Sequence, residues 1–120
     1  MVEEEVTDGR RIAELLASEL TGLAVGPLAD LTVVDADHDV EPTSAGAIAY
    51  GIAFDGERVG AVRVRPTEAL VSLDGAWPPA DVPDGASLRV EEGALVVTRG
   101  AAVKRAIDAI RAALVADQPD

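Results

Sequence analysis

The sequence predicts an α+β fold: a largely antiparallel sheet of five to six strands flanked by an N-terminal and a C-terminal helix, in the order α-β-β-β-β-β-β-α. Three observations predict it. Apolar residues recur at helical spacing near both ends of the chain, valine-rich and alternating segments fill the middle, and the connections are short and rich in glycine, proline and aspartate. Strands joined by hairpins between two helices favour an antiparallel sheet with both helices on one face.

The N-terminal helix is expected to begin after Thr7 or Asp8, since either side chain can cap the first turn. Residues 1–6 before it are expected to form a frayed acidic end. The apolar stripe of the helix consists of Ile12, Leu15, Leu16, Leu20 and Leu23. Glycine and proline over residues 22–27 end the helix, and residues 31–34 predict a short strand.

The clearest hairpin surrounds Asp55-Gly56. Large residues alternate with small ones before this turn, and the alternation resumes at Val62 after it. A two-residue turn would place Val62 opposite Ala49, whereas a three-residue loop over residues 54–56 places it opposite Ile48, on the face of the large residues. We therefore predict the three-residue loop, with Gly56 in the left-handed conformation before a bulge. The other, small-residue face then carries Ala47, Ala49, Gly51, Ala61, Arg63 and Arg65.

Three further segments complete the predicted fold. A strand over residues 69–73 follows Pro66, and a proline-rich loop over residues 75–85 contains Trp77. A second hairpin joins residues 88–90 to residues 94–98 through the loop Glu91-Glu92-Gly93. The C-terminal helix covers residues 101–116, with an apolar stripe formed by Val103, Ile107, Ile110 and Leu114.

The chain of 120 residues has no internal repeat and no linker longer than a loop, so we expect one domain over residues 1–120. The absence of cysteine excludes disulfides, thiol nucleophiles and thiolate metal sites. The acidic start, Glu3-Glu4-Glu5, does not resemble a signal peptide, and the uncharged stretch between Glu41 and Asp55 is too short to span a bilayer. We therefore expect a cytoplasmic protein with no membrane partner.

The net charge of −12 arises from 22 acidic residues against nine arginines and one lysine. Such a charge destabilises a compact chain by self-repulsion, which molar salt removes by shortening the Debye length to about 3 Å. In composition the chain resembles the small acidic proteins of haloarchaea, and the resemblance implies a halophilic archaeal protein of an uncharacterised family. An ordinary acidic mesophilic protein is the alternative, since GC-rich coding also depletes lysine. The charge opposes nucleic-acid binding, which relies on clustered lysine and arginine.

The candidate metal ligands are four acids that alternate after the first strand: Asp35, Asp37, Asp39 and Glu41. The pattern departs from a calcium-binding loop, because Val40 stands at the position of its glycine and Gly46 at that of its bidentate acid. A solvated acidic loop is the favoured interpretation. The only imidazole, His38, has Ser44 nearby but no third group of a catalytic triad. No phosphate-binding or dinucleotide motif occurs, so we expect no cofactor.

Five arginines lie in or beside predicted strands: Arg58, Arg63, Arg65, Arg89 and Arg99. The favoured interpretation pairs them with surface acids. The alternatives are an anion-binding site and a subunit interface in which the flat small-residue face meets a partner. The interface candidates are Arg63, Arg65 and Trp77, although a tryptophan in such a loop more often holds the loop against the sheet.

These observations favour a non-catalytic protein-association domain, most simply a homodimer, over an enzyme. The sequence contains no recognisable arrangement of catalytic residues, whereas a flat strand face and a tryptophan-containing loop favour association. The alternative is a small-ligand-binding or metal-dependent enzyme that uses the acidic loop of residues 35–41 and a strand arginine.

Overall fold

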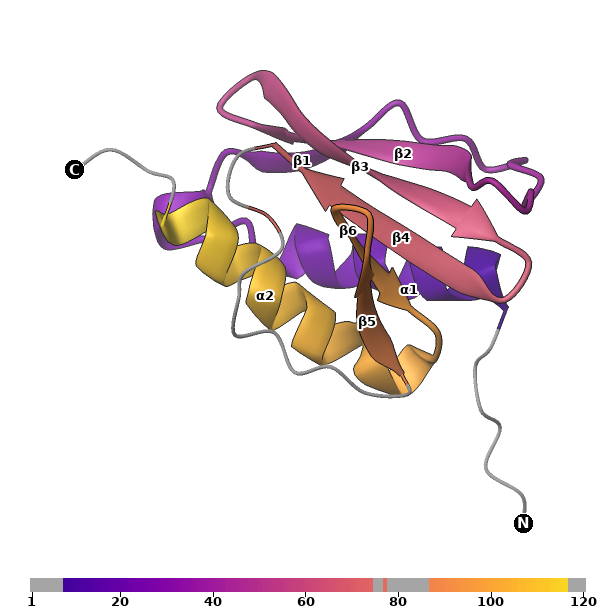
Figure 1. The fold of residues 1–120 in the computed structure, drawn as a ribbon. Coiled ribbons are helices and arrows are strands. Elements are labelled where there is room, and N and C mark those ends of the chain that lie inside the picture. Colours follow the sequence, from indigo (N-terminus) through magenta and orange to yellow (C-terminus); the bar gives the residue numbers. More distant parts are fainter. Residues whose placement is uncertain (1–7, 75–76, 78–86, 117–120) are drawn as a thin grey trace, which may run out of the picture.

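The computed structural model describes residues 8–74, 77 and 87–116. It has six strands in one antiparallel sheet, with both long helices on the same side of that sheet (Figure 1). The strands are β1 (Leu31–Val34), β2 (Ala47–Phe54), β3 (Glu57–Arg65), β4 (Glu68–Leu73), β5 (Leu88–Glu91) and β6 (Ala94–Val97). The helices are α1 (Gly9–Gly22) and α2 (Val103–Ala116), with short 3-10 turns at Gly26–Leu28 and Gly100–Ala102. The predicted α+β fold and its element order are therefore confirmed.

The start of α1 is fixed by a side-chain cap and by a close approach to the sheet. The carboxylate of Asp8 accepts hydrogen bonds from the backbone N–H groups of Arg10 at 2.9 Å and Arg11 at 3.4 Å. The next residue, Gly9, donates its N–H to the carbonyl of Pro66 at 3.1 Å. A Cβ at Gly9 would collide with the backbone carbonyl oxygen of Arg65, so the absence of a side chain lets the helix abut the turn between β3 and β4.

The first hairpin has a tighter turn than the sequence analysis predicts. Phe54 pairs with Glu57, and the two residues between them, Asp55 and Gly56, have φ angles of 54° and 81°. Two successive left-handed residues form the type I′ turn that suits the twist of a two-stranded ribbon. The predicted three-residue loop is therefore wrong.

Two irregularities in the ladder between β2 and β3 explain why the strand faces still fit. The register shifts once between Ile52 and Ala53 and again between Ile48 and Tyr50, and the second shift leaves Ala49 as an extra residue. Val62 consequently pairs with Tyr50, and Ile48 pairs with Arg63. The predicted pairing of Ile48 with Val62 is wrong, and Ala49 is buried in the main core instead of lying on the small-residue face.

The second hairpin shows the same one-residue difference. Glu91 pairs with Ala94, so the turn consists of Glu92 and Gly93, with φ angles of 48° and 78°. The predicted loop also included Glu91, which belongs to β5. The strand order β1-β2-β3-β4-β6-β5 places β6 between β4 and β5, so β4 and β5 are not neighbours although they follow one another in the chain.

The main core lies between the sheet and the two helices. It is built from aliphatic side chains and alanine, with Tyr50 as its buried aromatic residue. The hydroxyl of Tyr50 donates to the backbone carbonyl of Ala13 in α1 at 2.7 Å, and burial raises the pKa of this phenol, which keeps it neutral. Fully buried members include Ile12, Leu16, Leu20, Ile52, Val62, Val64, Leu95 and Ile110.

Candidate functional site

The face of the sheet that α1 and α2 leave uncovered, called the open face below, is the candidate functional surface. Contacts of α1 with β1, β3 and β4, and of α2 with β6, place both helices against the opposite face, and within the described ranges no helix lies over the open one (Figure 1). Strand alternation then decides which side chains the open face presents. Those of β2, β3 and β4 include Ile48, Gly51 and Ala53 of β2, Ala61, Arg63 and Arg65 of β3, and Glu68, Leu70 and Ser72 of β4.

The pair Ile48 and Arg63 lies on the open face near the end of the sheet where β2 begins and β3 ends. Ile48 is 50% exposed, although it lies within a strand. Arg63 stands directly opposite on β3, is also exposed, and has no hydrogen-bond or ion-pair partner among the residues that the structure describes. An accessible aliphatic side chain therefore lies beside an uncompensated guanidinium, with Gly46 close to the stem of Arg63.

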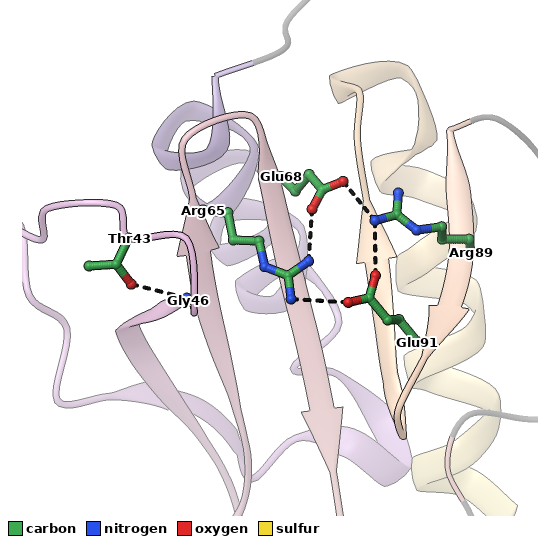
Figure 2. Close-up of polar contacts among 6 residues, drawn as sticks. All are labelled: Thr43, Gly46, Arg65, Glu68, Arg89 and Glu91. Atoms are coloured by element: carbon green, nitrogen blue, oxygen red, sulfur yellow. Dashed lines mark hydrogen bonds and ion pairs between the residues drawn. The ribbon is translucent and has the colours of Figure 1, made fainter.

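Four charged residues form a closed ring of ion pairs on the β3–β5 side of the open face (Figure 2). Arg65 reaches Glu68 at 3.0 Å and Glu91 at 3.1 Å. Arg89 reaches the other oxygens of the same two carboxylates, at 2.8 Å for Glu68 and 3.0 Å for Glu91. Each guanidinium thus bridges both acids and each acid bridges both guanidiniums, so the ring carries no net charge.

The sheet register explains how residues from β3, β4 and β5 meet. Arg65 and Glu68 pair across the tight turn between β3 and β4, while Arg89 and Glu91 lie two residues apart on the same face of β5. The intervening strand β6 contributes only the short side chains of Ala94 and Val96 to this face. These two residues form a small buried cluster with Leu70, and the long charged side chains extend across it.

Hydrogen bonding within the ring shifts the pKa values of its members. The bonds to the two carboxylates raise the pKa of Arg65 and of Arg89, and the same bonds lower the pKa of Glu91. Burial opposes ionisation of Glu68, but its bonds from Arg65 and Arg89 outweigh burial and lower its pKa. All four groups are therefore held in their charged forms near neutral pH, and the ring acts as a rigid polar border to the open face.

A shallow hollow marks the other end of the open face, where β3 begins and β4 ends. Its volume is about 340 Å³, and it is lined by Arg58, Gly60, Ala61, Ser72, Leu73 and Asp74. Arg58 lies over Gly51, where a Cβ would meet its guanidinium at 2.7 Å, and pairs with Asp35 at 3.6 Å. The glycine on β2 thus leaves the room that this arginine occupies.

The remaining candidate residues lie apart from the open face or are engaged locally. Trp77 is half-buried against the main core, and its indole Nε1–H donates to the carbonyl of Val71 at 3.0 Å. Arg99 precedes the 3-10 turn at Gly100–Ala102, with an extended backbone. Of the three interface candidates, Arg63 and Arg65 are thus neighbours on the open face, whereas Trp77 packs against the core on the helix side.

The acids of residues 35–41 point to different partners. Asp35, with a φ angle of 54°, pairs with Arg58, while the carboxylate of Asp37 accepts the backbone N–H of Asp39 at 3.0 Å. Asp39 and Glu41 are exposed. Across the described residues, no three histidine or acidic side chains are grouped closely enough to hold a metal ion. Asp35 and Asp37 are thus engaged with different partners.

Two features of this surface do not emerge from the sequence analysis. Glu68 and Glu91 were not singled out, although the spacing Arg65-x-x-Glu68 across a turn and Arg89-x-Glu91 along a strand would have suggested local ion pairs. Their closure into one ring requires the strand order β4-β6-β5, which no local pattern predicts.

Taken together, the geometry defines a two-layer α+β protein with two helices beneath an antiparallel sheet and one sheet face left free. The chain belongs to a family of unknown function (DUF7993), which matches residues 1–120. No curated protein and no solved structure matches it. Among the described helices, none is long and apolar enough to cross a membrane.

Proposed function

We propose that this chain is a non-catalytic protein-association module whose open face binds the open face of a second copy, which gives a homodimer. The observation that carries the proposal is the exposed pair of Ile48 and Arg63 on a sheet face that no described helix covers. A half-exposed aliphatic residue on such a face is what a face-to-face contact would bury.

The shape of the face supports a sheet-on-sheet contact. Arg58 covers Gly51, but Ala53 and Ala61 beside it have short side chains, and two packed sheets usually lie about 10 Å apart. A twofold dimer uses the same patch on both copies, so each favourable contact is made twice. Complete burial of a half-exposed isoleucine contributes about 1 kcal/mol per copy.

The charges of the face support association between acidic copies in salt. The ring of Arg65, Glu68, Arg89 and Glu91 is neutral, and Arg63 adds a positive charge to a chain whose net charge is −12. The open face is therefore a region where two copies repel one another least. Arg63 is free to pair with a carboxylate or a backbone carbonyl of the facing copy.

The distribution of the acids supports a second part of the proposal, that the protein works in the cytoplasm of a halophilic archaeon. Twelve of the fifteen described acidic residues are exposed and none is buried. Only four of these carboxylates, those of Glu14, Asp35, Glu68 and Glu91, form ion pairs within the described ranges. Molar salt would screen the repulsion among the rest.

Light scattering of the full chain tests the homodimer. In molar KCl at micromolar concentration we expect the mass of two chains of 12.3 kDa. We expect dissociation on dialysis to dilute buffer, because the repulsion between two highly acidic copies is then no longer screened. A monomer at every concentration in molar KCl would remove the proposal.

A further inference from the structure

We infer that a cavity between α1 and the segment of residues 36–40 binds a small carboxylate with an apolar body. The cavity has a volume of about 260 Å³ and lies on the helix side of the sheet, separate from the open face. Its walls come from α1 (Arg10, Ala13 and Ala17), from the loop (Asp37 and His38) and from β2 (Tyr50). Three separate parts of the chain thus enclose one small space.

The space exists because the facing residues are small. Ala13 and Ala17 lie four apart on one side of α1 and face Ala49, the extra residue of the irregular ladder in β2. Six of the twelve lining residues are exposed, so the cavity is open to solvent between the helix and the loop. Its alanine-lined interior suits the apolar body of a ligand.

Hydrogen bonds already engage the polar groups of the inner wall and fix its position. The hydroxyl of Tyr50 is bound to the carbonyl of Ala13, and the backbone N–H of Asp37 donates to the carbonyl of Ala49 at 2.8 Å. The loop is also tied to the helix, because Arg10 Nη2 donates to the carbonyl of His38 at 3.0 Å. The cavity is therefore held open by hydrogen bonds between its own walls, and a ligand would not need to create it.

The polar groups at the rim select the end group of the ligand. Arg10 uses one guanidinium nitrogen for the His38 carbonyl and, within the described part of the chain, its other N–H groups and the His38 imidazole have no partner. Two acids also line the rim: Glu14 pairs with Arg11 at 3.1 Å, whereas Asp37 accepts the N–H of Asp39 and keeps its negative charge. The unused groups include the guanidinium donors, which favour a carboxylate over an amine.

The inference is tested by amide NMR shifts of the full chain in molar KCl, with octanoate, octan-1-ol and octylamine as probes that share one apolar body. We expect saturable shifts at Ala13, Ala17 and Ala49 with octanoate, and at least tenfold weaker binding of the alcohol and the amine. Equal or tighter binding of either of these two probes would overturn the choice of a carboxylate. Absence of saturation with all three would overturn the site itself.

Two variants, each with a matched control, test whether Arg10 and the cavity itself are responsible for the binding. Arg10→Gln is expected to weaken octanoate binding at least tenfold, and Ala17→Leu is expected to abolish it by filling the cavity. The controls Arg111→Gln and Ala112→Leu change exposed residues of the same types on α2, and their affinities should stay within twofold of the parent. Circular dichroism confirms that each variant is folded. Unchanged affinity in both test variants would contradict the inference.

Discussion

Ile48 of β2 and Arg63 of β3 stand opposite one another on the open face, and both are exposed. The nearby Arg65 differs, because two carboxylates engage its guanidinium. The open face therefore has two parts: a closed, neutral ring of ion pairs, and the pair of Ile48 and Arg63, whose guanidinium has no described partner. The proposed contact between copies uses this pair, and the ring lies beside it.

The ion-pair ring is expected to stabilise the fold. Glu68 is 18% exposed and bonds both arginines, so Glu68→Gln leaves the two guanidiniums bridged by the single charge of Glu91. We expect the free energy of unfolding, measured by urea titration, to fall by about 1 kcal/mol. The exposed pair of Arg11 and Glu14 provides the control, since Glu14→Gln should cost less than about 0.5 kcal/mol. Equal losses in the two variants would contradict a special role for the ring.

The ring also predicts a pH dependence with a defined sign. The pKa values of Glu68 and Glu91 are lowered in the folded chain, so the unfolded carboxyls, with pKa values of about 4.3, bind protons first as the pH falls. The stability from the ring is complete above that value and is lost as the pH falls through the lower, folded pKa values. The gap in unfolding free energy between the parent and Glu68→Gln should therefore shrink from neutral to strongly acidic pH.

That gap is the quantity to follow, because acid also relieves the repulsion among the other carboxylates in both proteins. Denaturant titrations of the two proteins at matched ionic strength would measure it. A gap that stays constant down to strongly acidic pH would show that Glu68 does not act through its charge.

Gly9 and Gly22 are the first and last residues of α1, and they are expected to respond in opposite ways to alanine. A Cβ at Gly9 would collide with carbonyl oxygens of Arg65 and Glu68, whereas a Cβ at Gly22 meets nothing within 4 Å. We expect Gly9→Ala to lower the free energy of unfolding by about 2 kcal/mol or more, as overpacking does. Gly22→Ala should be neutral or stabilising by a few tenths of a kcal/mol, because alanine favours helix. Similar thermal midpoints for the two variants would contradict the close contact at Gly9.

Salt should change the stability of the monomer fold as well as its association. With most described acids exposed and outside ion pairs, dialysis from molar KCl to dilute buffer is expected to lower the thermal midpoint and the helical signal in circular dichroism. The measurement is made at a low protein concentration, where monomers predominate. Full folding and an unchanged midpoint without salt would contradict the halophilic part of the proposal.

Local chemistry predicted the helices and strands of this fold well. Asp8 caps α1 as expected, and β1 covers the predicted residues 31–34, because both depend on neighbouring residues alone. The turn at Asp55-Gly56 shows where local reasoning stops. Its composition favours a type I′ turn. The alternation of the flanking residues favours a three-residue loop instead, but only if both strands are regular. The ladder has two register shifts, so the type I′ turn and the buried valines are compatible.

The candidate site was only partly predictable for a related reason. Arg63 and Arg65 were expected on one strand face, and the structure places them there. Ile48 was expected on the other face, and only the extra residue Ala49 moves it beside Arg63. The ring and the cavity under α1 both join segments that are far apart in the chain. The strand order brings the ring residues together, and the position of the loop closes the cavity, so no short stretch of sequence predicts either.

The association surface is tested by the mass of Ile48→Glu beside that of Val115→Glu in molar KCl. Both parent side chains are exposed and aliphatic, at 50% and 43%, but Ile48 lies on the open face and Val115 lies on α2. We expect a monomer for Ile48→Glu, because a charge would be buried at the contact, and a dimer for Val115→Glu. A dimer that survives Ile48→Glu, with both variants folded, would contradict the open face as the association surface.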